Sequence, residues 1–250
     1  MRIFETHAHL DFKDFDKDRD ALINRCFKNG IEYIINIGTD ENTSEKSVKL
    51  AEKYKNIYAT VGYHPHEAKT YNEKKVIKHL SNKNVVAIGE IGLDFYRNHS
   101  PKNIQIEVFR KQLQIAKDHN LPVVVHDRDA HDDCLLHLKE FGLKKVIFHC
   151  FSGDLLFAEK LWSEGWLTSF TGTITYKNSA LDNVILAVPK ELFCIETDSP
   201  YLSPVPKRGK RNSPLNLTYI IERISEIKRL SPKLIAEQAF DNSVKFFLTK

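Results

Sequence analysis

The sequence has no apolar segment long enough to cross a membrane and no paired cysteines. No run approaches the roughly 18 apolar residues that a membrane helix needs, and the opening stretch MRIFETHAHLDF lacks the apolar region of a signal peptide. The four cysteines are scattered and form no Cys-x-x-Cys pair: Cys26, Cys134, Cys150 and Cys194. We therefore expect reduced thiols in a cytoplasmic protein that does not associate with a membrane.

Motifs of several other enzyme classes are also absent. There is no Gly-x-Ser-x-Gly elbow, no phosphate-binding P-loop and no Gly-x-Gly-x-x-Gly, and no cysteine has a paired base in its sequence context. The charges nearly balance, with 37 Lys and Arg against 33 Asp and Glu and a net charge of +4. This charge permits a polyanionic substrate without predicting one.

Short β-branched apolar runs alternate along the whole chain with longer amphipathic, charged stretches. That alternation indicates βα units and a parallel sheet. The eight strands that we expect span residues 2–6, 31–37, 57–62, 85–89, 122–125, 145–148, 166–170 and 192–196. Because 250 residues is close to the usual size of one (β/α)8 barrel, we predict an α/β protein of one domain, residues 1–250, with the TIM-barrel fold. The alternative is a doubly wound open sheet.

Helix boundaries and one long loop follow from serine, proline and glycine. Ser100-Pro101 and Ser231-Pro232 each predict a capping serine followed by proline at the first helical position. Three glycines are expected to end helices: Gly30, Gly142 and Gly165. The segment YLSPVPKRGKRNSP, residues 201–214, has too many prolines for a helix or a central strand. We expect it to be a loop at the carboxyl ends of the strands.

Six residues of the types that bind metal ions follow or end separate apolar runs. They are His7, His9, Glu90, His126, His149 and Asp198. In a TIM barrel the active site lies at the carboxyl ends of the strands, so these side chains are predicted to converge there. The eight-strand count and the presence of candidate ligands on both the first and the last strand favour a closed barrel over the open sheet, because only closure brings these two strands side by side.

The first ligands are predicted to be His7 and His9, which are two residues apart on an extended segment and point the same way. The alternative is a pair of surface histidines. Glu90 ends an apolar strand, where a carboxylate is costly to bury without a partner. Its two oxygens allow it to bridge two ions, whereas the alternative is an ion pair with a lysine or arginine of the barrel.

The remaining ligands come from later strands. His126 and His149 each close an apolar run, where a single histidine is more often a satisfied core residue, but two on successive strands favour metal binding. Asp198 is interpreted both as a ligand and as an acceptor of a proton from the attacking water. Glu90 and Asp198 are thus the candidate catalytic residues.

Six ligands suit two divalent ions that share a carboxylate bridge. Such ions stabilise charge on phosphate oxygens and lower the pKa of bound water toward about 7, which supplies hydroxide as the nucleophile. The histidine-rich set favours Zn²⁺, Mn²⁺ or Fe²⁺ and does not exclude Mg²⁺. A metal hydrolase is therefore predicted.

Seven motifs, taken in order, resemble those of the TatD family of metal-dependent deoxyribonucleases. They are ETHAHLD, VGYHPH, GEIGLDFY, PVVVHDRDA, HCFSG, ETDSPYL and RGKRNSP, between residues 5 and 214. The resemblance implies a TIM-barrel hydrolase fold akin to that of amidohydrolases, with divalent ions held by the six residues above. It also implies a cytoplasmic deoxyribonuclease, in some members a 3′-to-5′ exonuclease acting on single strands. Some TatD-like proteins instead remove D-amino acids from tRNA.

Four further residues are candidates for substrate binding. Lys207 and Arg211 belong to the densest basic cluster, just after Asp198, and are predicted to contact phosphates, although most such clusters are solvated. Arg128 is a second phosphate candidate, with an ion pair to Asp127 or Asp129 as the alternative. His64 is predicted to bond a phosphate oxygen or assist proton transfer, and a structural histidine is its alternative.

Three functions fit these observations. The first is a two-metal phosphodiesterase, a deoxyribonuclease that prefers single-stranded DNA because a duplex would not enter a concave barrel mouth. The second is a metal hydrolase of acyl bonds, such as D-aminoacyl-tRNA or a small-molecule amide, since the same ions polarise a carbonyl. The third is a catalytically inactive metal-binding or nucleic-acid-binding protein. A barrel of this size can be monomeric.

Overall fold

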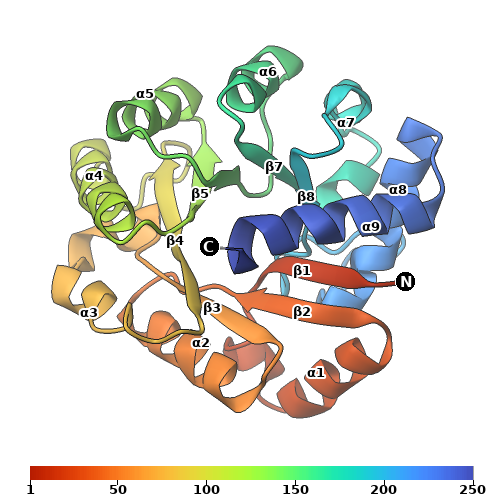
Figure 1. Cartoon of the computed structure of the whole chain (residues 1–250), viewed down its shortest axis with the longest axis horizontal. Coiled ribbons are helices and arrows are strands. Elements are labelled where there is room, and N and C mark those ends of the chain that lie inside the picture. The colour runs from red at the N-terminus through yellow and green to blue at the C-terminus, as the bar shows by residue number, and fades with distance from the viewer. Residues whose placement is uncertain (250) are drawn as a thin grey trace.

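The eight strands form one parallel sheet in chain order that curves into a nearly closed barrel (Figure 1). The computed structural model describes residues 1–249. The strands are β1 (Ile3–Ala8), β2 (Ile31–Asn36), β3 (Ile57–Val61), β4 (Val85–Asp94), β5 (Val123–Arg128), β6 (Val146–Phe148), β7 (Leu167–Phe170) and β8 (Phe193–Ile195). Each is parallel to the next. The predicted TIM-barrel fold is confirmed.

The barrel closes where β1 meets the segment that follows β8. Ala8 and Ser199 form a parallel bridge. On either side of it, the Asp198 N–H donates to the His7 carbonyl at 2.9 Å, and the His9 N–H donates to the Ser199 carbonyl at 2.8 Å. The alternative of an open doubly wound sheet is therefore wrong.

Within the described part of the chain, seven helices lie outside the sheet between successive strands, and two more follow the last strand (Figure 1). They are α1 (Arg19–Lys28), α2 (Glu41–Lys53), α3 (Glu73–Ile77), α4 (Lys102–Asp118), α5 (His131–Phe141), α6 (Leu155–Ser163), α7 (Asp182–Ala187), α8 (Leu217–Lys228) and α9 (Pro232–Ser243). Short 3-10 turns span Lys13–Phe15, Pro65–Thr70, Gly172–Thr175 and Pro214–Asn216. No helix in residues 1–249 combines the length and the apolarity needed to cross a membrane.

Most of the predicted helix boundaries are confirmed. Ser231 caps α9 by accepting the Leu234 N–H, with Pro232 in the first turn. Gly30, Gly142 and Gly165 follow α1, α5 and α6 with positive φ. The predicted cap at Ser100 is wrong: Pro101 occupies the cap position of α4. The Ser100 hydroxyl donates instead to the His66 carbonyl at 2.9 Å, so it ties the segment before α4 to the loop after β3.

Strands β4 and β5 extend further than predicted. β4 reaches Asp94 and β5 reaches Arg128, and the two strands stay paired up to these last residues. Their close approach depends on Gly92, which has φ +144° and whose added Cβ would lie 1.9 Å from the His126 carbonyl oxygen. Glu90 and His126 therefore lie within paired strands, where the backbone fixes their direction.

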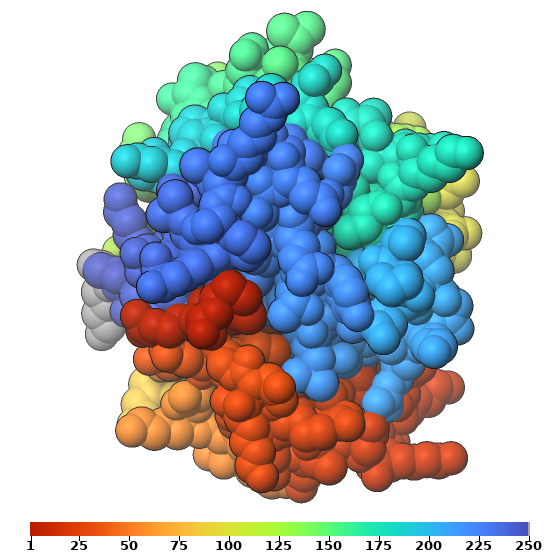
Figure 2. All heavy atoms as spheres, turned by 90° about the vertical axis from the view of Figure 1, so that its right-hand side faces the viewer, coloured from red at the N-terminus to blue at the C-terminus, as the bar shows by residue number. Residues whose placement is uncertain are grey.

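The amino-terminal end of the barrel is filled by the end of the chain. Helix α9 and the π-helical turn Val244–Leu248 lie across it, beside β1 (Figure 1), and Figure 2 shows the same segment packed against the first residues. Phe240 and Phe247 place their rings 6.0 and 6.1 Å from that of Phe4 on β1. This leaves the carboxyl ends of the strands as the open mouth.

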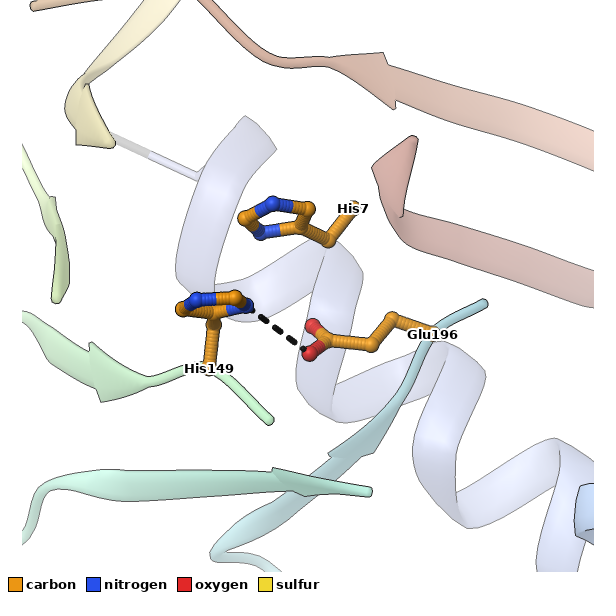
Figure 3. Close-up of side chains that lie close together, drawn as sticks. All are labelled: His7, His149 and Glu196. Atoms are coloured by element: carbon orange, nitrogen blue, oxygen red, sulfur yellow. Dashed lines mark ion pairs between the residues drawn. The ribbon is translucent and has the colours of Figure 1, made fainter. Parts of the chain in front are cut away.

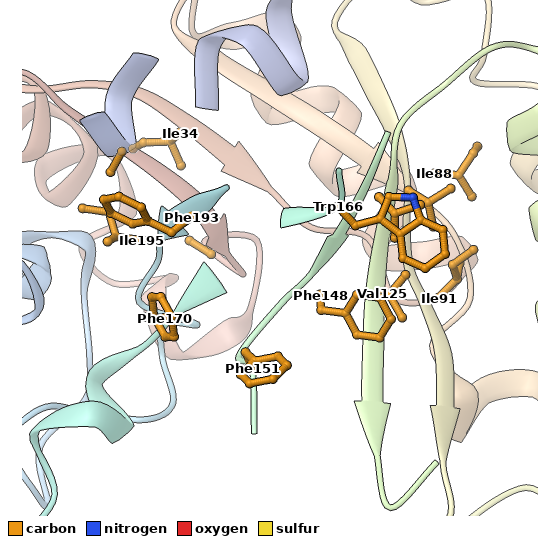
Figure 4. Packing of buried hydrophobic residues seen from close by; sticks show 14 of the residues in the cluster. Ile34, Ile88, Ile91, Val125, Phe148, Phe151, Trp166, Phe170, Phe193 and Ile195 are labelled. Atoms are coloured by element: carbon orange, nitrogen blue, oxygen red, sulfur yellow. The ribbon is translucent and has the colours of Figure 1, made fainter. Parts of the chain in front are cut away.

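A second apolar layer lies between the barrel and its helices (Figure 4). Phe148 on β6 stacks on Trp166 at 6.3 Å, and Trp166 donates its indole N–H to the Leu143 carbonyl at 3.1 Å. Both rings are 1% exposed. This rigid layer holds the strands whose ends carry the candidate ligands.

Candidate metal centre

The six predicted ligands converge at the open mouth of the barrel. His7 belongs to β1, Glu90 to β4 and His126 to β5, while His9, His149 and Asp198 each lie just beyond a strand. A pocket of about 540 Å³ opens over them. It is lined by His9, Glu90, His126, His149 and Asp198, together with His64.

One group of donors surrounds the first strand. The Nε2 atoms of His7 and His9 are 3.3 Å apart, so the pair points the same way, as predicted. Asp198 Oδ1 lies 3.6 Å from His7 Nε2 and 3.3 Å from His9 Nε2. These three atoms are close enough to share one ion.

A second group lies on β5 and after β6. His126 Nδ1 and His149 Nε2 are 3.3 Å apart, and each is 2.8 Å from Glu90 Oε1. His64 Nε2 is 3.5 Å from the same oxygen. This group offers imidazole nitrogens and one carboxylate oxygen.

Glu90 stands between the two groups. Its Oε1 faces His126 and His149, whereas its Oε2 is 3.3 Å from His7 Nε2 and 4.0 Å from His9 Nε2. In residues 1–249 only histidine nitrogens approach these oxygens within ion-pair distance, so the alternative pairing with a lysine or arginine is not present. The carboxylate is 3% exposed and needs nearby positive charge.

The electrostatics of the cluster favour an ionised, cation-binding site. Burial opposes ionisation of Glu90, but the charge of His149 and hydrogen bonds from His126 and His149 hold its pKa well below the usual range. Burial likewise opposes ionisation of Asp198, and the His9 hydrogen bond lowers its pKa. Burial lowers the pKa of His64 well below its usual value, which keeps that ring neutral. Burial opposes protonation of His9, His126 and His149, but the facing carboxylates raise the pKa of each ring, so divalent ions would replace the protons that balance the carboxylates in the metal-free protein.

A nucleophilic cysteine is not part of this site. Cys150 directly follows His149, and burial raises the pKa of its thiol to about 12. The thiol is therefore protonated at neutral pH and unsuited to attack.

Two buried carboxylates beside the candidate ligands escaped the sequence analysis. Glu196 lies 3.4 Å from His149 Nδ1 and accepts the Cys150 N–H at 2.6 Å. Figure 3 shows the Glu196 carboxylate at the edge of the His149 ring, while the His7 ring stacks on one face of His149 with the ring centroids 4.0 Å apart. Asp94 lies 3.3 Å from His126 Nε2 and 2.8 Å from His66 Nε2. Each carboxylate lies beside the ring nitrogen that does not face Glu90, where it would orient the histidine.

Glu5 is a third carboxylate that sequence analysis missed. It is fully buried and accepts the N–H groups of His7 and Thr197 at 3.1 and 2.9 Å, and the Thr197 hydroxyl at 2.6 Å. Burial raises its pKa to about 8. Its bonds join the His7 segment of β1 to the segment that holds Asp198, so it positions ligands without facing the pocket.

The four predicted substrate-binding residues lie in different surroundings. His64 and Arg128 line the pocket over the ligands. The Arg128 guanidinium lies 4.0 Å from the Tyr96 ring, and Asp127 bonds His131 instead. Lys207 and Arg211 are outside the pocket lining. Lys207 lies 5.8 Å from the Tyr219 ring, and Arg211 forms a two-bond pair with Asp18 at 2.7 and 2.8 Å.

Comparisons with known proteins agree with this geometry. The family model described as TatD related DNase matches residues 4–248. An uncharacterised metal-dependent hydrolase of Bacillus subtilis (strain 168), YabD, is 40% identical over 251 residues, which cover 98% of each chain. The 3′-5′ ssDNA/RNA exonuclease TatD of Salmonella typhimurium (strain LT2) is 34% identical over 256 residues, again 98% of each chain.

A solved structure gives the same result. The crystal structure of YJJV, a TatD homologue from Escherichia coli K12, matches with a TM-score of 0.94 and 31% sequence identity, over 100% of this chain and 99% of that chain. The resemblance stated from the sequence motifs is thus confirmed. The chain belongs to the TatD family and is a metal-dependent hydrolase.

Proposed function

We propose that the protein is a divalent-metal-dependent deoxyribonuclease that hydrolyses phosphodiester bonds of single-stranded DNA, removing nucleotides in the 3′-to-5′ direction. The observation that supports this most is the position of Glu90. Its two oxygens face two separate donor groups, so one carboxylate can bridge two ions, an arrangement suited to in-line displacement at phosphorus. The name of the Salmonella relative supports the substrate and direction.

The residues divide the chemistry between them. His7, His9 and Asp198 would hold one ion, His126 and His149 the other, and Glu90 both. Two divalent ions, Mg²⁺, Mn²⁺ or Zn²⁺, would lower the pKa of bound water and neutralise phosphate charge. Asp198, close to His9 and only 14% exposed at its side chain, would accept a proton from the attacking water.

The pocket rim provides groups for the strand. Arg128 and Arg97 both line the pocket and have no carboxylate within ion-pair distance in residues 1–249, so both are free to contact phosphate. His64, kept neutral by burial, can donate a hydrogen bond to a phosphate oxygen. Lys207, which lies outside the pocket, would contact a phosphate further along the DNA strand. We also propose a cytoplasmic location, as inferred from the scattered cysteines of the sequence.

The test is turnover by purified, metal-reconstituted protein on a 5′-labelled single-stranded oligomer with Mg²⁺, Mn²⁺ or EDTA. We expect a metal-dependent ladder that shortens from the 3′ end. Glu90→Gln should abolish the ladder and lower the bound metal measured by mass spectrometry. The matched control is Glu191→Gln, at an exposed glutamate far from the ligands, which should change neither.

Other outcomes would contradict the proposal. An intact oligomer with every metal would favour the acyl-hydrolase alternative, and D-aminoacyl-tRNA would be tested next. Faster cleavage of a blunt duplex than of the same strand alone would refute the single-strand preference. Full activity in Glu90→Gln would refute the bridging carboxylate.

A further inference from the structure

A second hollow, of about 670 Å³, lies beside the metal centre and has no part in it. It is enclosed by the loop after β6, the first turns of α6, and the segment between β7 and α7. Apolar side chains form most of its wall: Phe151, Leu155, Leu156, Leu181 and Val184. Its polar lining includes Ser152, Asp154, Thr173, Asn178, Ser179 and Asn183. Such a lining, apolar with a few polar groups, is typical of a small-ligand site.

The hollow adjoins the candidate ligands through the chain itself. Cys150, which lines it, directly follows His149, and its N–H donates to Glu196 at 2.6 Å. Phe151 comes next and is 4% exposed, with its ring parallel to that of Phe157 at 6.0 Å. In the view of Figure 4 Phe151 stands apart from the denser packing around Phe148. A group held in the hollow would therefore be a near neighbour of the reacting centre.

A cation lies over the far wall of the hollow. Tyr176 forms part of this wall, and its hydroxyl donates to the Ser203 carbonyl at 3.1 Å. The exposed Arg208 guanidinium lies 4.0 Å from the Tyr176 ring. In the part of the chain that the structure describes, no carboxylate lies within ion-pair distance of Arg208. A positive charge thus flanks an apolar, aromatic site.

The loop that bears Arg208 is fixed against this wall. A Cβ added to Gly172 would lie 2.3 Å from the Leu202 carbonyl oxygen, so the loop packs directly on the glycine. The Val205 N–H also donates to the Thr175 hydroxyl at 2.9 Å. Figure 2 shows the light-blue loop and the teal segment side by side at the right-hand edge. These contacts fix the loop, and with it the position of Arg208 over the Tyr176 ring.

We propose that this hollow binds one unpaired base of the nucleic acid strand, next to the scissile phosphate, while Arg208 contacts a backbone phosphate outside it. Single-strand sites combine aromatic or apolar surface for the base with cations for the backbone. The amides of Asn178 and Asn183 can bond the edge of the base. This inference rests on the proposed function. It gives the single-strand preference a cause, because a paired base could not enter the hollow.

The experiment measures binding in EDTA, where the strand is not cut. Fluorescein-labelled single-stranded tetranucleotides are titrated by anisotropy, one with all bases and others with an abasic residue at each position in turn. Ala180→Trp places an indole at the edge of the hollow, and Ala187→Trp is the matched control, since both alanines are exposed and Ala187 lies outside the hollow.

At one position of the strand, removal of the base should weaken binding to the wild type and to Ala187→Trp by about tenfold or more. This factor lies within the ~1–3 kcal/mol contributed by one stacked base. Ala180→Trp should bind the complete strand and the strand abasic at that position equally. Arg208→Ala should weaken both strands alike and reduce the dependence of affinity on salt by about one ion. Retention of the base preference in Ala180→Trp, or no preference in the wild type, would overturn the proposal.

Turnover of the same strands with metal added distinguishes this inference from the nuclease proposal. Base-dependent binding without cleavage would refute the nuclease and keep the base site. Cleavage without base-dependent binding would keep the nuclease and refute the base site.

Discussion

Replacing Glu196 with glutamine should weaken metal binding while leaving the barrel folded. Glu196 touches His149 through Nδ1, the ring nitrogen that faces away from Glu90. Glutamine keeps the size of the side chain and an oxygen for the Cys150 N–H, but it removes the negative charge beside the imidazole. His149 would then be a weaker electron donor and less firmly oriented.

The expected magnitude follows from this contact. Loss of a carboxylate that orients a metal-binding histidine typically costs about 10- to 100-fold in metal affinity, which corresponds to about 1.4–2.7 kcal/mol. The 3.4 Å separation is long for a hydrogen bond, so we expect the lower half of that range. The first donor group is His7, His9 and Asp198, and of these only His7, which stacks on His149, lies near Glu196. Affinity for the ion held by that group should therefore fall less.

The assay is calorimetric titration of metal-free protein with Mn²⁺ or Zn²⁺. Glu191→Gln is the matched control, because its carboxylate is exposed. Glu196→Asp should bind metal more tightly than Glu196→Gln but less tightly than the wild type, because the carboxylate is restored on a shorter side chain. Equal dissociation constants for wild type and Glu196→Gln would refute the orienting role.

Stability separates this role from a purely structural one. Glu196 is 1% exposed, and burying an ionised carboxylate is costly without a strong partner. Its contacts with His149 and His7 nevertheless leave the pKa of Glu196 below its usual value, so removing the charge should lower the melting temperature of the metal-free protein only slightly. A marked fall in the metal-free melting temperature would show that Glu196 chiefly supports the fold.

Three further predictions concern stability. Removing metal with EDTA should lower the melting temperature by about 5–11 °C. Metal at a hundredfold excess over Kd stabilises the folded state by ~2.7 kcal/mol, and each kcal/mol shifts the melting temperature of a protein of this size by about 2–4 °C. An unchanged melting temperature would refute metal binding to the folded state. Trp166→Ala should cost about 3–5 kcal/mol in denaturant unfolding, since the indole is buried and bonded; a loss below 1 kcal/mol would contradict the packing. Arg211→Ala should cost about 0.5 kcal/mol at pH 7. The Arg211 hydrogen bond lowers the pKa of Asp18, so this contribution is present above the unfolded pKa, about 4, and disappears as pH falls through the lower folded pKa; a pH-independent difference, with a raised KM, would favour phosphate binding instead.

The fold and the main cluster could be predicted because each depends on local pattern. Continuous apolar runs bounded by charged helices gave the number and order of the strands. The spacing of His7 and His9 alone required their rings to lie on one side of β1, and their Nε2 atoms are 3.3 Å apart. Parallel strands then brought the remaining donors to one end without further information.

The supporting carboxylates could not be predicted in the same way. Asp94 and Glu196 stand within the quoted motifs, but nothing in their spacing distinguishes a residue that orients a ligand from a ligand. Asp94 was further obscured because a register shift between Ile88 and Ile91 interrupts the strand pattern, and β4 was expected to end at residue 89. The pairing of Arg211 with Asp18 joins residues 193 positions apart, which no local pattern reveals.

The candidate metal centre lies on the seam of the barrel, and this would give its ligands a second role. β1 and β8 share no continuous ladder, and the closure depends on a few bonds around His7, Ser199 and Asp198. His7 and His9 come from one side of that seam and Asp198 from the other, so an ion held by all three would join the first and last strands. The same ion would hold Asp198 in place for proton transfer. If the proposed ligands hold an ion, closure of the barrel and assembly of the reactive centre would depend on the same few residues.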